Sequence, residues 1–444
     1  MADFVISGNN FSWKLTFAGG GGSKADFSKT QVRGMNITET MFEPFYHGSI
    51  TFVDPVNVIE DSVLSRGDGS EKVTIDFMPS EMSQSEAVKF DFVLNGETNN
   101  PALNSRLNAF KTYHLLDANY FKLNQPIPYG ERFRGKVGDI LEQIFKDKGL
   151  PTGEWSSGAH EVDIFPEHIL PPTSYRYSDL VKYLMRINYN ADGDGYGEGT
   201  AVRSLLYWDR KGGKYVFKPL NKIFQSPAPI ETFVCGEFPD GGSNANNSGS
   251  GGPSYVSSML KASDLTTPML TYSNEYFMNY LVTGYDPQLG EHGIREIRIE
   301  DVKGKWEKEI VSGLGGNLGG AGKAFMPLNK AKKQELFRTF SLPFSLDKSA
   351  KLAEAEMIGN MTFFNMELCV RQDGHPARTA GAFVNVSSAA KATDGDAKLC
   401  GTWLITKCTH EFIQDSYYNT VNGIKPALGP GSDSGGIQAI TEDC

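Results

Sequence analysis

The sequence predicts an α+β fold that is rich in β-structure. Three observations lead to this prediction. Stretches near both ends of the chain alternate apolar and polar residues, which is typical of strands with one buried face. Stretches in the middle repeat apolar residues at the spacing of an amphipathic helix. The chain has 444 residues, which is too long for one ordinary hydrophobic core, so we expect about two to four domains.

The first third of the chain has the pattern of short strands separated by turns. Residues 73–77 (VTIDF) alternate cleanly, and residues 90–94 (FDFVL) alternate less cleanly. Residues 48–54 and 111–116 are further β-rich runs. Because such strands must share a core, we expect a small barrel or sandwich over residues 1–118.

The period then changes to that of helices. In residues 134–149 (RGKVGDILEQIFKDKG), apolar residues recur from Val137 at i, i+3, i+4, i+7 and i+8. This spacing predicts an amphipathic helix, and Gly149 is placed to end it. A second helix is expected from Ser178, which suits an N-cap. A third is expected over residues 347–358.

Strands return after about residue 200, at 204–208 and 214–219. Two Gly-rich segments follow, residues 240–254 and 312–323, and the alternating residues 294–310 between them predict a hairpin arm. The last 20 residues are rich in Gly, Pro and Ser and are expected to form a tail. The strands expected before this tail are residues 363–370, 381–386, 401–413 and 416–424.

Charge and cysteine content exclude several classes of protein. The chain has 53 acidic and 43 basic residues, for a net charge of −10. We see no basic stripe with interleaved aromatic residues, so nucleic-acid binding, sequence-specific or general, is not expected. No apolar run approaches the roughly 20 residues of a membrane span, and the N-terminus lacks the features of a signal peptide. Five scattered cysteines favour free thiols over a disulfide framework.

The Gly-rich residues 312–323 do not form a phosphate-binding loop. Asn317 stands where that motif requires its first Gly. Ala324 follows Lys323, where a Ser or Thr hydroxyl would bind Mg²⁺. We therefore expect no nucleotide site.

Residues 190–198 (NADGDGYGE) resemble the start of an EF-hand loop. Asn190, Asp192 and Asp194 offer side-chain oxygens at alternate positions, which could wrap a hard cation. However, Ala201 stands at position 12, where a bidentate Glu is expected. Two interpretations stay open: an acidic Gly-rich turn, which the pattern favours, and a weak Ca²⁺ site.

The remaining motifs indicate no chemistry. Cys408 and His410 would share one face of a strand, but two ligands do not make a zinc site, so a satisfied or surface pair is favoured. The carboxylates at 60–61 lie in a polar stretch, and the RGD tripeptide at 66–68 is interpreted as coincidence. No nucleophile elbow or HExxH motif is present. We therefore predict that the chain is not an enzyme and has no catalytic, cofactor or metal site.

The order of elements carries a family resemblance. It runs through the segments 41–55 (MFEPFYHGSITFVDP), 111–145, 175–194 (YRYSDLVKYLMRINYNADGD), 352–370 and 403–420 (WLITKCTHEFIQDSYYNT). In this order the segments resemble the baseplate hub proteins of T-even-type contractile phages. They are more distantly similar to the N-terminal part of type VI secretion spike proteins. The clearest match is the last segment, a long strand followed by a polar turn and a return strand.

This resemblance implies a structural protein, the hub of a contractile tail baseplate. Such a hub is a homotrimer that joins the six-fold tail tube to the three-fold central spike and lets DNA pass. Its implied partners are the spike protein, a tail-tube or tube-initiator protein and baseplate wedge proteins. Its implied location is the virion tail, after assembly in the host cytoplasm. A receptor- or carbohydrate-binding tail protein and a tail-associated cell-wall hydrolase stay open as alternatives.

The resemblance also implies two tail-tube-like β-barrels per chain with intervening α/β domains. The implied domains are a first barrel at 1–118, an intervening helical α/β domain at 119–200, the start of the second barrel with a Gly-rich loop at 201–254, an intervening domain with a divergent arm at 255–344, the completion of the second barrel at 345–425 and a flexible tail at 426–444.

Overall fold

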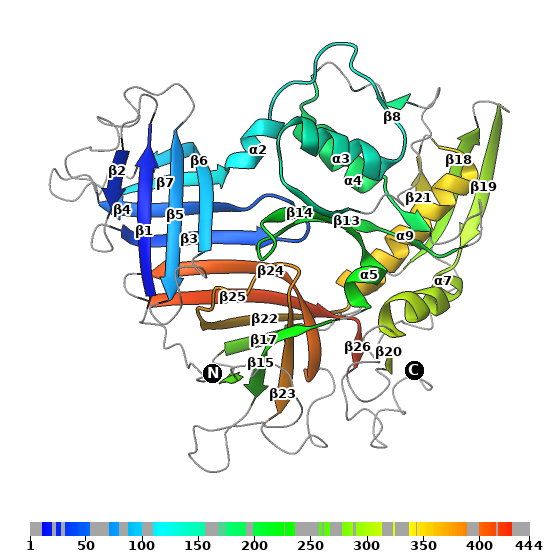
Figure 1. Cartoon of the computed structure of the whole chain (residues 1–444). Helices are drawn as coiled ribbons and strands as arrows, with labels where there is room; N and C mark the ends of the chain where they lie inside the picture. The colour runs from blue at the N-terminus through cyan, green and yellow to red at the C-terminus, as the bar shows by residue number, and fades with distance from the viewer. Residues whose placement is uncertain are drawn as a thin grey trace.

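The residues described by the computed structural model form an α+β fold that is rich in β-strands, as the sequence predicts (Figure 1). They are residues 11–19, 24–27, 32–53, 71–79, 88–99, 110–155, 168–169, 171, 174–191, 199–225, 227–235, 257–259, 262–266, 278–286, 290–312, 323–324, 337–342, 344–388, 399–413 and 416–428.

A 14-stranded sheet is the largest element. Its pairs are antiparallel except for those that β15 makes with its two neighbours. The main path runs through β16 (Ser257–Met259), β15 (Pro229–Cys235), β23 (Phe383–Ser388), β24 (Gly401–Ile413), β3 (Val32–Thr40), β4 (His47–Val53), β7 (Phe110–Asp117), β6 (Val88–Asn99), β5 (Lys72–Pro79), β1 (Phe11–Ala18) and β2 (Lys24–Phe27). A branch runs from β24 through β25 (Ser416–Lys425) and β22 (Met366–Asp373) to β17 (Ala262–Thr266).

Strand β24 joins the two ends of the chain. Its residues 401–404 pair with β23, and its residues 407–413 pair with β3. In Figure 1 the blue N-terminal strands therefore lie directly beside the orange and red C-terminal strands. Two hydrophobic cores lie along this sheet. One contains Ile75, Phe90 and Phe412, and the other contains Trp403 and Val384.

The predicted alternation in the N-terminal strands is confirmed. Val73, Ile75 and Phe77 of β5 are all buried, as are Phe90 and Phe92 of β6. A strand places alternate side chains on opposite faces, so a one-sided core leaves this period in the sequence.

A first α/β unit packs above this sheet. Helices α3 (Val137–Asp147) and α4 (Tyr177–Arg186) share a core with a three-stranded sheet. The unit contains α2 (Ala118–Leu123), β8 (Phe133–Arg134), β9 (Thr152–Trp155), β10 (His168–Ile169), β11 (Asn190–Ala191), β12 (Ala201–Val202), β13 (Ser204–Asp209) and β14 (Lys214–Pro219), with α5 (Leu220–Phe224) after it.

The predicted helix ends are right for α3 and wrong for α4. Gly149 has a φ of +63° and donates its N–H to Lys146 O at 2.9 Å, as a helix-ending glycine should. Helix α4 begins at Tyr177, before Ser178, and its N-cap is Arg176. The Asp179 carboxylate accepts the Arg176 N–H at 3.1 Å, so the side chain that caps this end comes from inside the helix.

The hairpin of β13 and β14 belongs to this unit. Both strands lie in the sheet with β9, and their side chains Leu206 and Phe217 enter the core of α3 and α4. We expected the second barrel to start at residue 201. The first later strand that enters the 14-stranded sheet is β15.

A second α/β unit contains the helix predicted at 347–358, which is longer than predicted: α9 is Leu346–Phe363. It packs on β18 (Asn279–Asp286), β19 (Glu291–Ile297) and β21 (Phe337–Ser341), beside α7 (Ile299–Trp306) and the π-helical turn η4 (Glu307–Val311). Strand β20 (Lys323–Ala324) pairs with β26 (Ala427–Leu428).

The hairpin predicted over residues 294–310 is wrong. Strand β19 ends at Ile297, and the chain then turns into α7. Val302, Trp306 and Ile310 are buried and recur every four residues, so they form a helical stripe. The alternation of charged and apolar residues in this segment is a coincidence and does not indicate strands.

Several predicted features lie outside the described residues. They are the carboxylates at 60–61, the RGD tripeptide at 66–68, the proposed Ca²⁺ loop beyond residue 191, the Gly-rich segments 240–254 and 313–322 and the tail beyond residue 428. No helix in the described part of the chain combines the length and the apolar character that a membrane span requires.

Gly284 of β18 lies against the backbone of Leu346, the first residue of α9. A Cβ atom added to Gly284 would lie 2.4 Å from Leu346 Cα and 2.5 Å from Leu346 N, both backbone atoms. We therefore expect Gly284→Ala to lower the free energy of unfolding by about 1–3 kcal/mol, measured by urea denaturation.

Gly304 provides the matched control for this substitution. It lies on the exposed side of α7, and an added Cβ would meet nothing within 4 Å. Gly304→Ala should stabilise the protein by about 0.5–1 kcal/mol, because Ala favours the helix. The packing account of Gly284 is contradicted if Gly284→Ala is as stable as the wild type.

Candidate functional site

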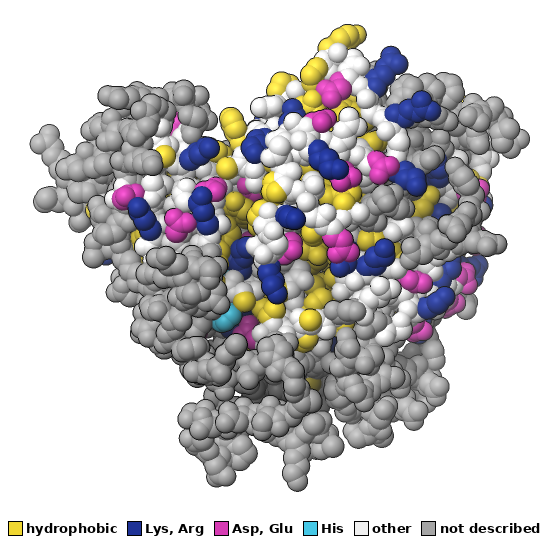
Figure 2. Space-filling model, viewed as in Figure 1, with side chains coloured by type: hydrophobic (Ala, Val, Ile, Leu, Met, Phe, Trp, Pro, Cys, Tyr) yellow, Lys and Arg dark blue, Asp and Glu magenta, His cyan; other side chains and the backbone are white. Residues whose placement is uncertain are grey.

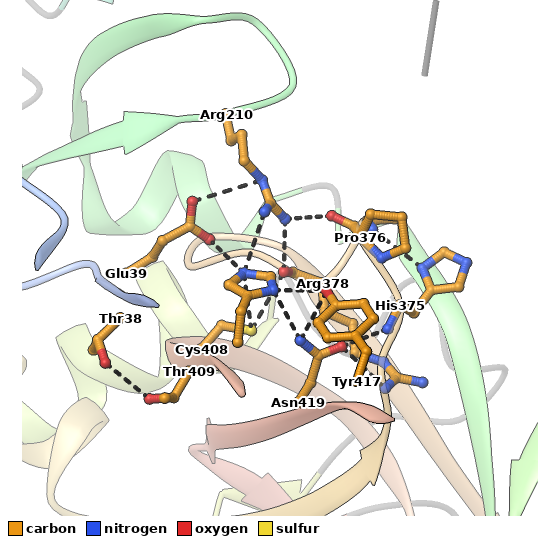
Figure 3. A network of polar contacts seen from close by, with 12 residues as sticks. Thr38, Glu39, Arg210, His375, Pro376, Arg378, Cys408, Thr409, Tyr417 and Asn419 are labelled. Atoms are coloured by element: carbon orange, nitrogen blue, oxygen red, sulfur yellow. Dashed lines mark hydrogen bonds and ion pairs between the residues drawn. The ribbon is translucent and has the colours of Figure 1, made fainter. Parts of the chain in front are cut away.

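A cluster of buried polar side chains lies where several distant segments of the chain meet (Figure 3). It connects the 14-stranded sheet to the β13–β14 hairpin of the first α/β unit. We call it the junction cluster, and it consists of Glu39 on β3, Arg210 in the turn after β13, Glu231 on β15, Arg378 between β22 and β23, His410 on β24, and Tyr417 and Asn419 on β25.

His410 is at the centre of the junction cluster. Its Nδ1 lies 2.9 Å from Asn419 Nδ2 and 2.8 Å from Tyr417 Oη. Asn419 Oδ1 accepts the backbone N–H of His375 at 2.6 Å, which fixes the amide so that Nδ2 points at the ring. An amide NH₂ group can only donate, so Nδ1 accepts and the ring proton lies on Nε2.

Glu39 accepts a hydrogen bond from this Nε2–H. His410 Nε2 lies 3.3 Å from Glu39 Oε2, and Arg210 Nε lies 3.6 Å from Glu39 Oε1. Burial by itself would raise the pKa of Glu39, but Arg210 and His410 outweigh burial and hold that pKa below its usual value. Burial lowers the pKa of His410 and outweighs the opposing effect of Glu39. The cluster at neutral pH therefore holds an ionised Glu39 beside a neutral His410.

Arg210 connects the tip of the β13–β14 hairpin to the sheet by an ion pair and hydrogen bonds. Its guanidinium reaches down between Glu39 and two backbone carbonyls, as Figure 3 shows. It donates to Arg378 O at 2.7 Å and to Pro376 O. These bonds tie the tip of the β13–β14 hairpin to the segment between β22 and β23.

Arg378 and Glu231 form a second buried ion pair. Arg378 Nη2 lies 2.8 Å from Glu231 Oε2, and Nε bonds the other carboxylate oxygen, so the pair is bidentate. Arg378 also donates to Asp373 O and, at 3.4 Å, to Asn419 Oδ1. Burial by itself would lower the pKa of Arg378, but Glu231 outweighs it and raises that pKa. The two ion pairs bring equal numbers of positive and negative charges into the interior.

The pair Cys408 and His410, noted in the sequence, is a satisfied buried pair. Cys408 Sγ lies 3.8 Å from His410 Nε2 and donates to Arg378 O at 3.3 Å. Burial raises the pKa of the Cys408 thiol well above its usual value, so the thiol stays protonated. No group of three or more His, Cys, Asp or Glu side chains in the described residues is arranged to hold a metal ion. The geometry suits a structural role for Cys408 and not a role as a nucleophile.

Sequence reasoning found only two members of this neighbourhood. It noted Cys408 and His410 because they stand close together on one strand. Glu39, Arg210 and Arg378 were missed, since each comes from a different segment and none belongs to a local motif. The one available signal was the match of the 403–420 segment to hub proteins, which singled out His410.

A second buried link joins the same two parts of the molecule. Asp117, at the end of β7, accepts the Tyr215 hydroxyl of β14 at 3.0 Å and the N–H of Asn119 at 2.8 Å. Trp208 of β13 packs against Tyr215, with ring centroids 4.7 Å apart. The hairpin is therefore held by Arg210 at its tip and by Tyr215 along its length.

Asp117 predicts a pH dependence of stability. Burial raises the pKa of Asp117 from 3.8 to about 7. A raised folded-state pKa stabilises the fold fully below pH 3.8, and this contribution is lost as the pH rises towards about 7. Between pH 5 and pH 8 this effect should lower the free energy of unfolding of the wild type by on the order of 2 kcal/mol. Asp117→Asn should not show this decrease, measured by urea unfolding at both pH values.

The exposed carboxylate Asp139 of α3 provides the control. Asp139→Asn should leave the difference in unfolding free energy between pH 5 and pH 8 as it is in the wild type. If Asp117→Asn leaves that difference unchanged as well, the proton on Asp117 is not its source.

The sequence matches no protein-family model and no curated protein. Similarity in structure extends over nearly the whole chain. The tail protein from Neisseria meningitidis MC58 superposes with a TM-score of 0.53 at 8% identity, covering 93% of this chain and 97% of that chain. The 43 kDa tail protein of prophage MuSo2 from Shewanella oneidensis gives 0.51 at 11% identity, covering 94% and 99%.

The chain has the fold of phage tail proteins. A Francisella PdpA–VgrG complex is also similar, with a TM-score of 0.45 at 11% identity, covering 93% of this chain and 58% of that chain. The family resemblance that the sequence suggested is confirmed at the level of the phage-tail-protein fold.

Proposed function

We propose that this phage-tail-like protein is the structural hub of a contractile tail baseplate. In this proposal it is a homotrimer that joins a six-fold tail tube to a three-fold central spike and allows DNA to pass. It would act in the virion tail after assembly in the host cytoplasm. Its partners would be the spike, a tube or tube-initiator protein and baseplate wedge proteins.

The observation that carries this proposal is the composition of the 14-stranded sheet. The sheet contains strands from both ends of the chain, and its two parts enclose separate cores. We infer that these parts are two tube-like barrels, residues 1–118 forming the first, and strands β15–β17 with β22–β25 forming the second. Three chains would then present six similar units to the tube and three copies to the spike.

Rigid attachment between the two parts is what such an adaptor needs. Strand β24 is continuous across both parts, and the junction cluster fastens the first α/β unit to the sheet beside it. The charged side chains of the cluster are paired with one another in the interior, which supports a structural role. The proposal therefore assigns the function to interfaces between subunits and partners.

The charge distribution supports passage of DNA without binding. The chain carries a net charge of −10. On the face shown in Figure 2, acidic and basic side chains are interspersed, and the basic ones form no continuous patch. Such a surface does not retain a polyanion.

Size-exclusion chromatography with light scattering tests the trimer. The expected mass is three times the chain mass of 48.8 kDa, and it should persist over a dilution series because an obligate ring buries a large interface. A species of one chain mass at every concentration, both alone and with the co-expressed spike protein, would count against the proposal.

A further inference from the structure

We propose that the junction cluster is an acid-sensitive joint: protonation of His410 releases the tip of the β13–β14 hairpin, where Arg210 lies, from the segment between β22 and β23. The cluster is the place where charged groups of both parts meet in the interior. The inference does not depend on the proposed hub function, since it concerns one chain only.

A second proton on His410 would have a single acceptor. Its Nε2–H already points at Glu39, and its Nδ1 accepts from Asn419. A proton on Nδ1 would face the Asn419 NH₂ group at 2.9 Å. The amide cannot turn over to accept it, because Asn419 Oδ1 is occupied by the His375 N–H. Tyr417 Oη would be the remaining acceptor, at 2.8 Å.

Charge balance in the junction cluster depends on a neutral His410. Glu39 and Glu231 offset Arg210 and Arg378, so the neutral ring leaves the cluster without net charge. A protonated His410 would add an uncompensated positive charge. Its Nε2 lies 3.2 Å from Arg210 Nη1, so two cations would compete for Glu39. An unpaired buried charge is strongly unfavourable, and the least costly relief is to expel one cation.

Arg210 is the group that protonation of His410 would displace. The titratable and charged groups that face His410, or face a group in contact with it, are Glu39 on β3, Arg210 in the hairpin turn, Glu231 on β15, His375 and Arg378 between β22 and β23, Cys408 on β24 and Tyr417 on β25. From β5 and β6 the ring meets only Phe77 and Phe90 among the described residues. Arg210 is the member nearest to solvent, with 10% of its side chain exposed, and it lies in a turn.

Arg378 is less free to move. It is bidentate to Glu231 and deeply buried. Expulsion of Arg210 breaks its bonds to Arg378 O and Pro376 O, which hold the hairpin tip. The lowered pKa of His410, which burial causes, agrees with a ring that resists protonation until the joint opens. Acid therefore loosens the tip of the hairpin, while Leu205, Tyr207 and Val216 stay packed in the core that the hairpin shares with the sheet.

Hydrogen–deuterium exchange of the full chain tests the joint. Protection factors, corrected for the intrinsic effect of pH, are compared at pH 7.5 and pH 5.0. With Asp117→Asn as the common background, so that the link to Tyr215 does not titrate, protection at the tip end of the hairpin, residues 208–215, should fall by about tenfold on acidification while the residues of the junction cluster are unchanged. Protection in α9 should change by less than about twofold, since its core contains no titrating cluster group.

Three variants make the test specific. His410→Gln keeps a hydrogen-bond donor for Glu39 but cannot be protonated, so hairpin protection should not fall. His375→Gln is the matched control and should behave as the Asp117→Asn background does. Arg210→Met removes the fastener, and protection in the hairpin should be low at both pH values; this variant decides the matter if His410→Gln does not fold.

Three results would overturn the proposal. They are a hairpin whose protection in the Asp117→Asn background does not change with pH, a fall that persists in His410→Gln, and an equal fall in α9, which would indicate global acid unfolding. A hairpin that keeps the protection of this background in Arg210→Met would also overturn it.

Discussion

Arg378→Ala is expected to lower the free energy of unfolding by about 3–5 kcal/mol, measured by urea denaturation at neutral pH. The substitution leaves Glu231 buried without its bidentate partner, and the carboxylate has a side-chain exposure of only 6%. It also removes the donors to Asp373 O and Asn419 Oδ1. The cost is large because an ion that stays buried loses both water and its counter-charge.

Two further variants separate this cause from a general effect of losing an arginine. Arg371→Ala breaks the exposed pair with Glu411, whose closest N–O distance is 2.9 Å, and should cost less than about 1 kcal/mol. The double variant Arg378→Met/Glu231→Met should recover much of the stability, since no charge is then left unpaired. The account of the ion pair fails if Arg378→Ala costs no more than Arg371→Ala.

Trp403→Ala is expected to cost about 3–5 kcal/mol in the same unfolding measurement. Trp403 lies fully buried in the part of β24 that pairs with β23. Its indole N–H donates to Leu399 O at 2.8 Å, and Lys425 Nζ lies 4.9 Å from its ring centre. Truncation would open a cavity in the core of the C-terminal part of the sheet.

Trp403→Phe provides the graded control. It keeps most of the ring volume but loses the N–H donor, so we expect a cost of about 1–2 kcal/mol. If the alanine variant were as stable as the phenylalanine variant, the packing of this core around Trp403 would be contradicted.

Local patterns in the sequence predicted those elements that bury one face. The alternation in residues 73–77 and the stripe that starts at Val137 both survive in the structure, because each side chain's direction follows from the backbone period. Gly149 ends its helix as predicted for the same local reason. The approximate ends of β24 and β25 were also visible in the sequence.

Other features depend on contacts that the local sequence does not contain. The alternation in residues 294–310 suggested strands, but tertiary burial of Val302 and Trp306 selects a helix. The pairing of β24 with β3 joins segments more than 350 residues apart, and no local pattern predicts it. The junction cluster is missed for the same reason, since its members become neighbours only after these long-range pairings form.

The position of the chain in an assembled tail tests the central claim most directly. Tail particles that contain this chain can be labelled with an antibody fragment raised against it and imaged by electron microscopy. The hub account predicts label on the tail axis, where the tube meets the central spike, with three copies per particle. Label at the baseplate periphery or on the fibres would contradict it and would favour a receptor-binding role.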